Sequence, residues 1–141
     1  MSKNRLNRSL TVMLIDDCEI DIFIHRRLIT TFFPDFNVIG FKNTNDALSF
    51  LKDSANDDKH FHVIPDFILL DIFMPIKSGF EFLSEYKNIN FPKKRIPNLI
   101  VVTVSINPLD KYKCLNNKCV KEYLIKPLLA DHISSLFSNE E

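Results

Sequence analysis

The sequence predicts an α/β fold, a doubly wound parallel sheet of five strands with five helices. Five short apolar runs alternate with segments whose apolar residues recur at helical spacing, and no internal repeat or linker interrupts them. Such a chain forms one parallel sheet with helices on both faces, because strand–helix–strand crossovers are right-handed. A chain of 141 residues suits one domain with a single core. We expect this domain at residues 10–138, between a disordered tail at 1–9 and a short tail at 139–141.

The first strand–helix unit begins with residues 10–15. This run (LTVMLI) is apolar and β-branched, and it stops at Asp16 and Asp17. From residue 19 apolar residues recur at helical spacing, and the helix is expected to end before Pro34. Its apolar side is expected to consist of Ile20, Phe23, Ile24 and Leu28, with Asp21, His25 and Arg26 on the other side.

The second unit combines a strand at residues 36–41 with a short helix. Thr44 is expected to cap this helix, because a threonine hydroxyl can accept a hydrogen bond from the first turn. The apolar stripe is expected to consist of Ala47, Leu48 and Leu51. Residues 53–62 are polar and without a period, which predicts a surface loop.

The central strand is predicted at residues 67–70. This run (FILL) is apolar throughout and leads straight into Asp71, as expected of a strand buried on both faces of a parallel sheet. Pro75 and Gly79 then bend the chain into a loop, and a helix follows at about residues 78–87.

Two further units complete the predicted sheet. Residues 99–104 (LIVVTV) form a strand, and Pro108 opens a helix that fades near residue 116 and carries Leu109, Tyr112 and Leu115. Residues 120–125 form the last strand, which closes on a Lys-Pro pair. In the final helix, 128–137, the residues expected to face inward are Leu129, Ile133, Leu136 and Phe137.

The composition argues against several classes of partner. The 18 basic and 18 acidic residues cancel, so overall charge favours neither nucleic acid nor an anionic membrane surface. Three cysteines without C-x-x-C spacing argue against a disulfide framework or a zinc site. No apolar stretch approaches the roughly 20 residues that span a bilayer, and the polar start does not resemble a signal peptide. We therefore expect a cytoplasmic protein that binds neither nucleic acid nor membrane.

Charged or hydroxyl side chains lie at the ends of four predicted strands: Asp16 and Asp17, Asp71, Thr103, and Lys126. Because parallel strands deliver their carboxyl ends to one rim of a sheet, these residues are expected to meet there. Clustered carboxylates raise one another's pKa unless a cation is present. The three aspartates therefore predict a divalent ion, and an all-oxygen ligand set suits Mg²⁺ better than zinc.

This set of residues indicates phosphoryl chemistry at Asp71. Taken alone, Asp71 is equally compatible with a turn or a helix cap. A carboxylate beside Mg²⁺ can instead act as a nucleophile toward phosphorus and form an acyl phosphate. Lys126 and Thr103 supply a cation and a hydroxyl that can stabilise the phosphoryl oxygens.

In order and spacing, these residues resemble the receiver domain of two-component response regulators, which has a CheY-like, flavodoxin-like fold. The match runs from about residue 10 to 137. It is carried by the Asp16-Asp17 pair, by LLDIFMP with Pro75 four and Gly79 eight residues after Asp71, by the VVT of the fourth strand and by Lys126-Pro127.

The resemblance implies a role for each residue. Asp71 would be the phosphoacceptor, Asp17 a direct Mg²⁺ ligand, Asp16 a ligand through water, and Phe73 a ligand through its backbone carbonyl. The switch hydroxyl, the phosphate-binding lysine and the aromatic residue that changes rotamer would be Thr103, Lys126 and Tyr123. The Lys126–Pro127 bond is expected to be cis.

Two positions depart from the family pattern. Phe73 places an apolar ring where many receivers have a polar side chain, and Val104 is larger than the small residue usual after the switch hydroxyl. Ser105 also lies two residues after Thr103, so that water access to the phosphoryl group is expected to be unusual. We expect Phe73 to alter the rate of autodephosphorylation, and Val104 to restrict approach to the phosphoryl group or the choice of small phosphoryl donors.

The resemblance predicts a single-domain response regulator rather than an enzyme. It would accept a phosphoryl group from a sensor histidine kinase or a phosphotransfer protein and act through phosphorylation-dependent contact with a downstream protein, or in a phosphorelay. It would be a monomer, or a homodimer through the face of the fourth helix, fifth strand and fifth helix. One alternative is a pseudo-receiver that is never phosphorylated. Another is a phosphatase of the haloacid dehalogenase type, which needs a second aspartate where this chain has Phe73.

Overall fold

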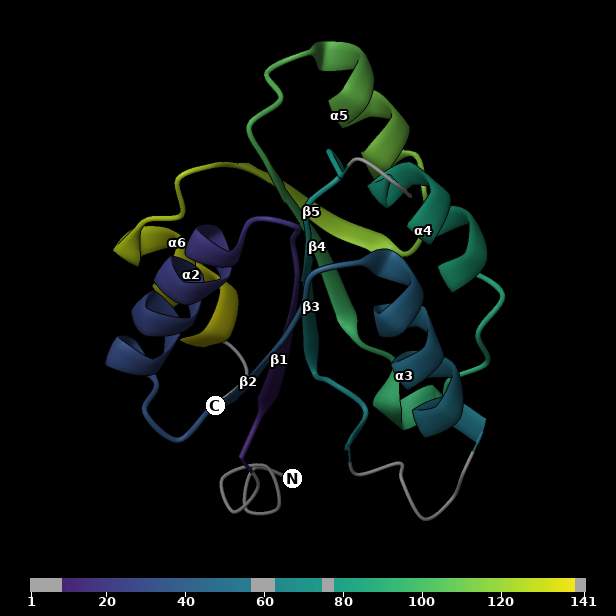
Figure 1. Cartoon of the computed structure of the whole chain (residues 1–141), viewed down its shortest axis with the longest axis horizontal. Helices are drawn as coiled ribbons and strands as arrows, with labels where there is room; N and C mark the ends of the chain where they lie inside the picture. Colours follow the sequence, from purple (N-terminus) through teal and green to yellow (C-terminus); the bar gives the residue numbers. More distant parts are fainter. Residues whose placement is uncertain (1–8, 57–62, 75–77, 139–141) are drawn as a thin grey trace.

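A computed structural model describes residues 9–56, 63–74 and 78–138 (Figure 1). The parallel sheet has the strand order β2-β1-β3-β4-β5. The strands are β1 (Thr11–Ile15), β2 (Asn37–Phe41), β3 (Phe67–Leu70), β4 (Asn98–Thr103) and β5 (Val120–Ile125). The helices are α2 (Glu19–Phe32), α3 (Thr44–Asn56), α4 (Gly79–Tyr86), α5 (Pro108–Leu115) and α6 (Ala130–Phe137), with a 3₁₀ turn, η2 (Lys93–Arg95). The predicted fold class is confirmed.

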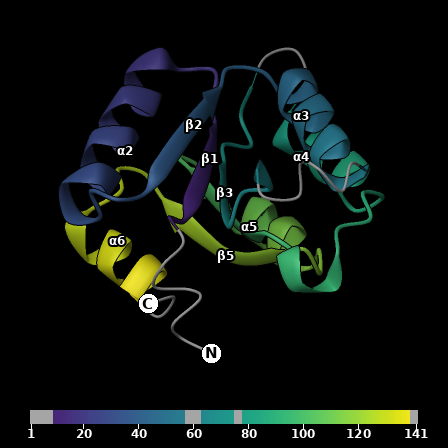
Figure 2. The same cartoon turned by 90° about the horizontal axis from the view of Figure 1, so that it is seen from below.

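The helices form two layers around the sheet. Helices α2 and α6 lie on one face, and α3, α4 and α5 lie on the other (Figures 1 and 2). Successive residues of the central strands alternate between the layers: Ile68 and Leu70 belong to the core under α3 and α4, whereas Phe67 and Leu69 belong to the core under α2 and α6. All four side chains are buried, as the apolar run of β3 predicts.

The buried side of α2 differs from the sequence prediction. The buried residues are Ile22, His25 and Ile29. The expected apolar side is largely exposed, with relative exposures of 68% for Ile20, 60% for Phe23 and 49% for Ile24. The short β1–α2 connection fixes the rotation of the helix, because the Cys18 N–H donates to Asp16 Oδ1 at 2.9 Å. The prediction was wrong because it chose the side richer in apolar residues.

Helix α3 also differs from the sequence prediction, both in its capping residue and in where it ends. Asn43, rather than Thr44, caps it, because the Asp46 N–H donates to Asn43 Oδ1 at 2.8 Å. The helix continues to Asn56, so residues 53–56 are not part of a loop. The Ser54 hydroxyl donates to the Phe50 carbonyl at 2.8 Å, which satisfies a buried polar group inside the helix. The rest of the predicted loop, 57–62, lies outside the described residues, as do Pro75, residues 1–8 of the expected first tail and 139–141.

Helix α6 starts two residues later than predicted, at Ala130. Leu129 precedes it and is 56% exposed, so this residue does not face inward as expected. Its backbone N–H donates to His132 Nδ1 at 2.9 Å and so marks the helix start. The other predicted inward residues are buried: Ile133, Leu136 and Phe137.

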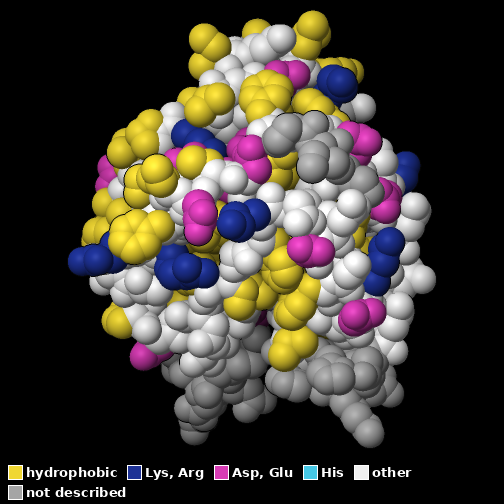
Figure 3. All heavy atoms as spheres, viewed as in Figure 1, with side chains coloured by type: hydrophobic (Ala, Val, Ile, Leu, Met, Phe, Trp, Pro, Cys, Tyr) yellow, Lys and Arg dark blue, Asp and Glu magenta, His cyan; other side chains and the backbone are white. Residues whose placement is uncertain are grey.

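Two surfaces of the molecule are rich in exposed hydrophobic side chains. In the space-filling view they gather over α2 and over α5 (Figure 3). On α5 the three apolar residues singled out from the sequence, Leu109, Tyr112 and Leu115, are exposed, and the buried residue of this helix is Cys114. Within the described segments, no helix combines the length and apolar character required to cross a bilayer.

Candidate functional site at the carboxyl ends of the strands

The carboxyl ends of the parallel strands bring the predicted site residues to one rim. Asp16 follows β1, Asp71 follows β3, Thr103 ends β4, and Lys126 follows β5. The neighbouring strands are in register: Ile15 pairs with Leu70, and Thr103 pairs with Ile125. Backbone hydrogen bonds continue past the strands, from the Asp71 N–H to the Ile15 carbonyl and from the Lys126 N–H to the Thr103 carbonyl.

Three carboxylates form the acidic part of this rim. One oxygen from each of Asp16, Asp17 and Asp71 lies within 4.8 Å of the other two. Asp16 and Asp71 are buried, whereas Asp17 is exposed. The side chains of Asp16 and Asp71 also accept backbone N–H bonds two residues on, from Cys18 at 2.9 Å and from Phe73 at 3.1 Å. These turns hold both carboxylates in place after their strands.

Among the described residues, Lys126 places a cation at the rim. Its ammonium lies 2.7 Å from Asp16 Oδ2, 2.8 Å from Asp21 Oδ2 and 3.4 Å from Asp71 Oδ2. Asp21 lies in the first turn of α2 and was not among the residues predicted from the sequence. The Lys126–Pro127 peptide bond that follows is cis, as expected.

The electrostatics of the rim follow from burial and from Lys126. Burial raises the pKa of Asp71 to about 6, although the Phe73 N–H and the Lys126 charge oppose the shift. Burial alone would lower the pKa of Lys126, but its hydrogen bonds to Asp16 and Asp21 raise it above its ordinary value. The hydrogen bond from Lys126 lowers the pKa of the Asp21 carboxyl. At neutral pH Asp71 is therefore mostly ionised, although burial disfavours its charged form.

The two predicted switch residues are joined through Ser105. Thr103 is fully buried, and its Oγ1 accepts the Ser105 N–H at 3.2 Å. The Tyr123 hydroxyl donates to the Ser105 carbonyl at 3.1 Å. The Ser105 hydroxyl in turn donates to Asp110 Oδ2 on α5 at 2.6 Å. The sequence analysis considered Ser105 only for water access to the phosphoryl group, and Asp110 was not among the predicted site residues.

The loop after Asp71 contains one glycine that sterics require. A Cβ atom on Gly79 would lie 2.5 Å from the Ile72 Cα and 2.8 Å from the Asp71 carbonyl oxygen. The Gly79 N–H also donates to the Ile72 carbonyl at 3.0 Å, so α4 begins in direct contact with the segment that carries Asp71. The side chains of the two departures from the family pattern are exposed, by 49% at Phe73 and 64% at Val104.

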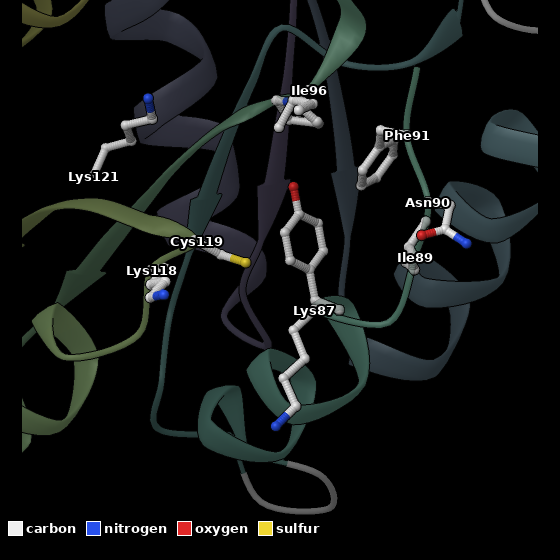
Figure 4. Close-up of a pocket in the computed structure, with 10 residues that line it drawn as sticks. Lys87, Ile89, Asn90, Phe91, Ile96, Lys118, Cys119 and Lys121 are labelled. Carbon is white, nitrogen blue, oxygen red and sulfur yellow. The ribbon is translucent and has the colours of Figure 1, made fainter. Parts of the chain in front are cut away.

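A separate hollow of about 400 Å³ lies at the other end of β4 and β5, before these strands begin. Its lining includes Lys87 and Phe91 after α4, Ile96 before β4, and Lys118 and Cys119 before β5 (Figure 4). It shares no residue with the carboxylate rim. The chemistry that the rim residues indicate is therefore not located in this hollow.

Comparison with known proteins identifies the family. No family model matches the chain. The response regulator Rcp1 of Synechocystis is 31% identical over 104 residues, which are 74% of this chain and 68% of Rcp1. The chain belongs to the receiver domains of response regulators.

Other relatives and solved structures agree with this assignment. The receiver is 31% identical over 125 residues to the sensor histidine kinase CheAY of Helicobacter pylori, and 29% identical over 119 residues to hybrid signal transduction histidine kinase D of Dictyostelium discoideum. These matches cover 89% and 82% of the receiver but only 14% and 7% of the two kinases. A two-component response regulator from Cytophaga hutchinsonii superposes with a TM-score of 0.80 at 25% identity, covering 94% of this chain and 97% of that one. One from Legionella pneumophila gives 0.75 at 26%, covering 94% and 98%.

The rim of this receiver fits a magnesium ion. Among the described residues, four carboxylates share the rim with the ammonium of Lys126: the three clustered aspartates, and Asp21, which contacts the lysine. One lysine does not balance four carboxylates, and burial, which raises the pKa of Asp71 to about 6 despite Lys126, leaves the ionised form of Asp71 in need of further stabilisation. Carboxylate oxygens are the ligands that Mg²⁺ prefers. The ligand roles of Asp16, Asp17, Asp71 and the Phe73 carbonyl remain predictions.

Proposed function

We propose that this receiver accepts a phosphoryl group on Asp71 from the phosphohistidine of a sensor histidine kinase or phosphotransfer protein. The proposal rests on the position of Asp71, a buried carboxylate at the strand ends between two further aspartates and a lysine. In the transfer, a P–N bond to the donor imidazole breaks and a P–O bond to Asp71 forms. The electron pair of the broken bond stays with the imidazole.

Each rim residue has a task in this reaction. Asp71 supplies the nucleophilic oxygen, and its pKa of about 6 leaves it ionised at neutral pH. Lys126, 3.4 Å from Asp71 Oδ2, is placed to bind a phosphoryl oxygen. A magnesium ion held by Asp16, Asp17, Asp71 and the Phe73 carbonyl would neutralise charge on the phosphoryl oxygens.

The signal leaves the site through the fourth strand. Thr103 turns toward the new phosphoryl group, so its contact with the Ser105 N–H breaks. Tyr123, whose hydroxyl bonds to the Ser105 carbonyl, then moves inward. The face of α5, β5 and α6 changes as a result, and a downstream protein reads it.

The same face offers a contact to a second copy of the chain. It includes the exposed Leu109, Tyr112 and Ile125, which a second copy could cover. The receiver is therefore either a monomer or a homodimer that forms through α5, β5 and α6. It acts in the cytoplasm through a downstream protein or as an intermediate in a phosphorelay, without nucleic acid or membrane as a partner. It has no catalytic activity beyond its own phosphorylation and dephosphorylation.

The proposal is tested with acetyl phosphate as the donor. In the presence of Mg²⁺ the protein is expected to gain the mass of one phosphoryl group, and Asp71→Asn is expected to abolish the gain. Chelation of Mg²⁺ with EDTA is expected to abolish it as well. Asp35→Asn, which changes an exposed aspartate remote from the rim in sequence, serves as the matched control. Absence of any gain with acetyl phosphate and with a phosphorylated kinase identifies the chain as a pseudo-receiver instead.

A further inference from the structure

Each of the three N–H donors of the Lys126 ammonium has an acceptor within reach. A lysine ammonium carries three N–H donors. Three acceptors surround it: Asp16 Oδ2 at 2.7 Å, Asp21 Oδ2 at 2.8 Å and Asp71 Oδ2 at 3.4 Å. The two short contacts draw the ammonium toward Asp16 and Asp21, so the contact with Asp71 is the longest of the three. A new anionic partner must therefore replace one of these acceptors.

The three acceptors differ in how readily water can replace the lysine. The side chains of Asp16 and Asp71 are 6% and 9% exposed, whereas that of Asp21 is 33% exposed. A buried carboxylate that loses its cation keeps the full cost of desolvation, but a partly exposed carboxylate regains water. Because Asp71 is the residue that would carry the phosphoryl group, the two short contacts are the ones to compare, and Lys126 gives up Asp21 at a lower cost than Asp16.

Asp21 also remains in a favourable environment after it is released. It lies in the first turn of α2, where the backbone N–H groups and the helix dipole stabilise a negative charge. Asp16 differs in this respect, because its other oxygen accepts the Cys18 N–H and fixes it in the β1–α2 turn. The first turn of α2 therefore provides a stable position for a carboxylate without a lysine partner.

We propose that Asp21 is the exchangeable partner of Lys126: it holds the ammonium in the resting receiver and releases it when Asp71 carries a phosphoryl group. The inference rests on the proposed function, because the phosphoryl group is the competing anion. Asp21 bonds to no reacting atom, so it is a positioning residue. Its release gives α2 a signal from the site that is separate from the one through Thr103 and Tyr123.

The test uses beryllofluoride, a tetrahedral stand-in for the phosphoryl group, at saturating Mg²⁺. Asp21→Asn removes the competing carboxylate, and we expect beryllofluoride to bind about fivefold more tightly, the upper range for a partly exposed ion pair. Asp21→Glu keeps a carboxylate and is expected to restore wild-type affinity. Glu19→Gln is the matched control, because Glu19 is an exposed acid of the same helical turn that pairs with Lys42 at 3.5 Å. It is expected to bind beryllofluoride as the wild type does.

A second measurement follows Asp21 itself. In the wild type, beryllofluoride is expected to shift the carboxyl ¹³C resonance of Asp21 in an NMR spectrum and to leave that of Glu19 in place. An unmoved Asp21 resonance, or an Asp21→Asn variant that binds beryllofluoride no more tightly than the wild type, overturns the exchange. A wild type that responds neither to beryllofluoride nor to acetyl phosphate overturns the proposed function and the exchange together. A wild type that is phosphorylated without any Asp21 response overturns the exchange alone.

Discussion

The substitution Asp71→Asn is expected to make the metal-free protein more stable at neutral pH. Folding buries Asp71 and raises its pKa from 3.8 to about 6. At a pH above both values the unfolded chain and the folded protein are both ionised, and the folded protein then carries a charge in a poorly solvated position. Asparagine has nearly the same shape and no charge, and it can still accept the Phe73 N–H.

The magnitude follows from the two pKa values. A tenfold change in proton affinity corresponds to about 1.4 kcal/mol, so the full difference is about 3 kcal/mol at pH 7.5. A pKa raised by folding lowers stability as the pH rises through the folded value, and it has no effect below the unfolded value. At pH 4.5 the difference is therefore expected to fall to about 1 kcal/mol.

The assay is urea unfolding in EDTA at pH 4.5 and pH 7.5. The free energy of unfolding of Asp71→Asn is compared with that of the wild type and of the exposed control Asp35→Asn. Saturating Mg²⁺ is expected to narrow or reverse the difference, because the ion stabilises the wild-type rim by binding to the folded state. A variant that is less stable than the wild type at pH 7.5, or a difference independent of pH, would refute this reasoning.

Three further changes test other parts of the rim. Lys126→Met leaves buried carboxylates without their lysine and is expected to cost about 3 kcal/mol in urea unfolding in EDTA, with partial recovery in Mg²⁺; no loss in EDTA would contradict this. Gly79→Ala forces a Cβ against the Ile72 backbone and is expected to cost at least about 2 kcal/mol, whereas Gly40→Ala meets only side chains and should cost less; equal thermal stabilities would be the wrong result. Phe73→Asn replaces a half-exposed ring and is expected to change the half-life of the phosphorylated protein, which mass spectrometry follows; an unchanged half-life rejects the idea.

The strand ends of the site could be predicted from the sequence. Asp16 and Asp71 each follow a short apolar run typical of a buried strand, and Lys126 follows a run that contains Val120, Tyr123, Leu124 and Ile125. Parallel pairing then brings the carboxyl ends together through the backbone alone, whatever the side chains in between. For this reason four residues far apart in the chain, these three and Thr103, could be assigned to one rim from the order of strands and helices alone.

The part of the site contributed by α2 could not be predicted in this way. Asp21 reaches Lys126, and His25 is buried, because the short turn after Asp16 sets the rotation of the helix. Periodicity shows which residues share a side of a helix but not which side faces the sheet. In α2 the exposed side carries Phe23, and the apolar pattern therefore indicated the wrong side.

Several local hydrogen bonds could not be predicted from the types of the residues involved. Asn43 and Thr44 are adjacent and both suit a helix cap, and only the bond from the Asp46 N–H distinguishes them. The sequence drew attention to Ser105 only through its distance from Thr103, yet this residue takes part in four hydrogen bonds. A signal for it in the sequence would have required the position of Asp110, which depends on how α5 sits above the sheet.

Ser105 makes two kinds of contact that mutation can change independently: its backbone bonds to Thr103 and Tyr123, and its side chain bonds to α5. The amide and the carbonyl of this residue hold the hydroxyls of Thr103 and Tyr123, and any amino acid except proline supplies both groups. The side-chain hydroxyl instead ties the loop to Asp110 on α5. Mutation at this position can therefore loosen or tighten the first turn of α5 while the hydroxyls of Thr103 and Tyr123 stay hydrogen-bonded to the same backbone unit. Receivers that need different output surfaces can in this way inherit the same internal linkage.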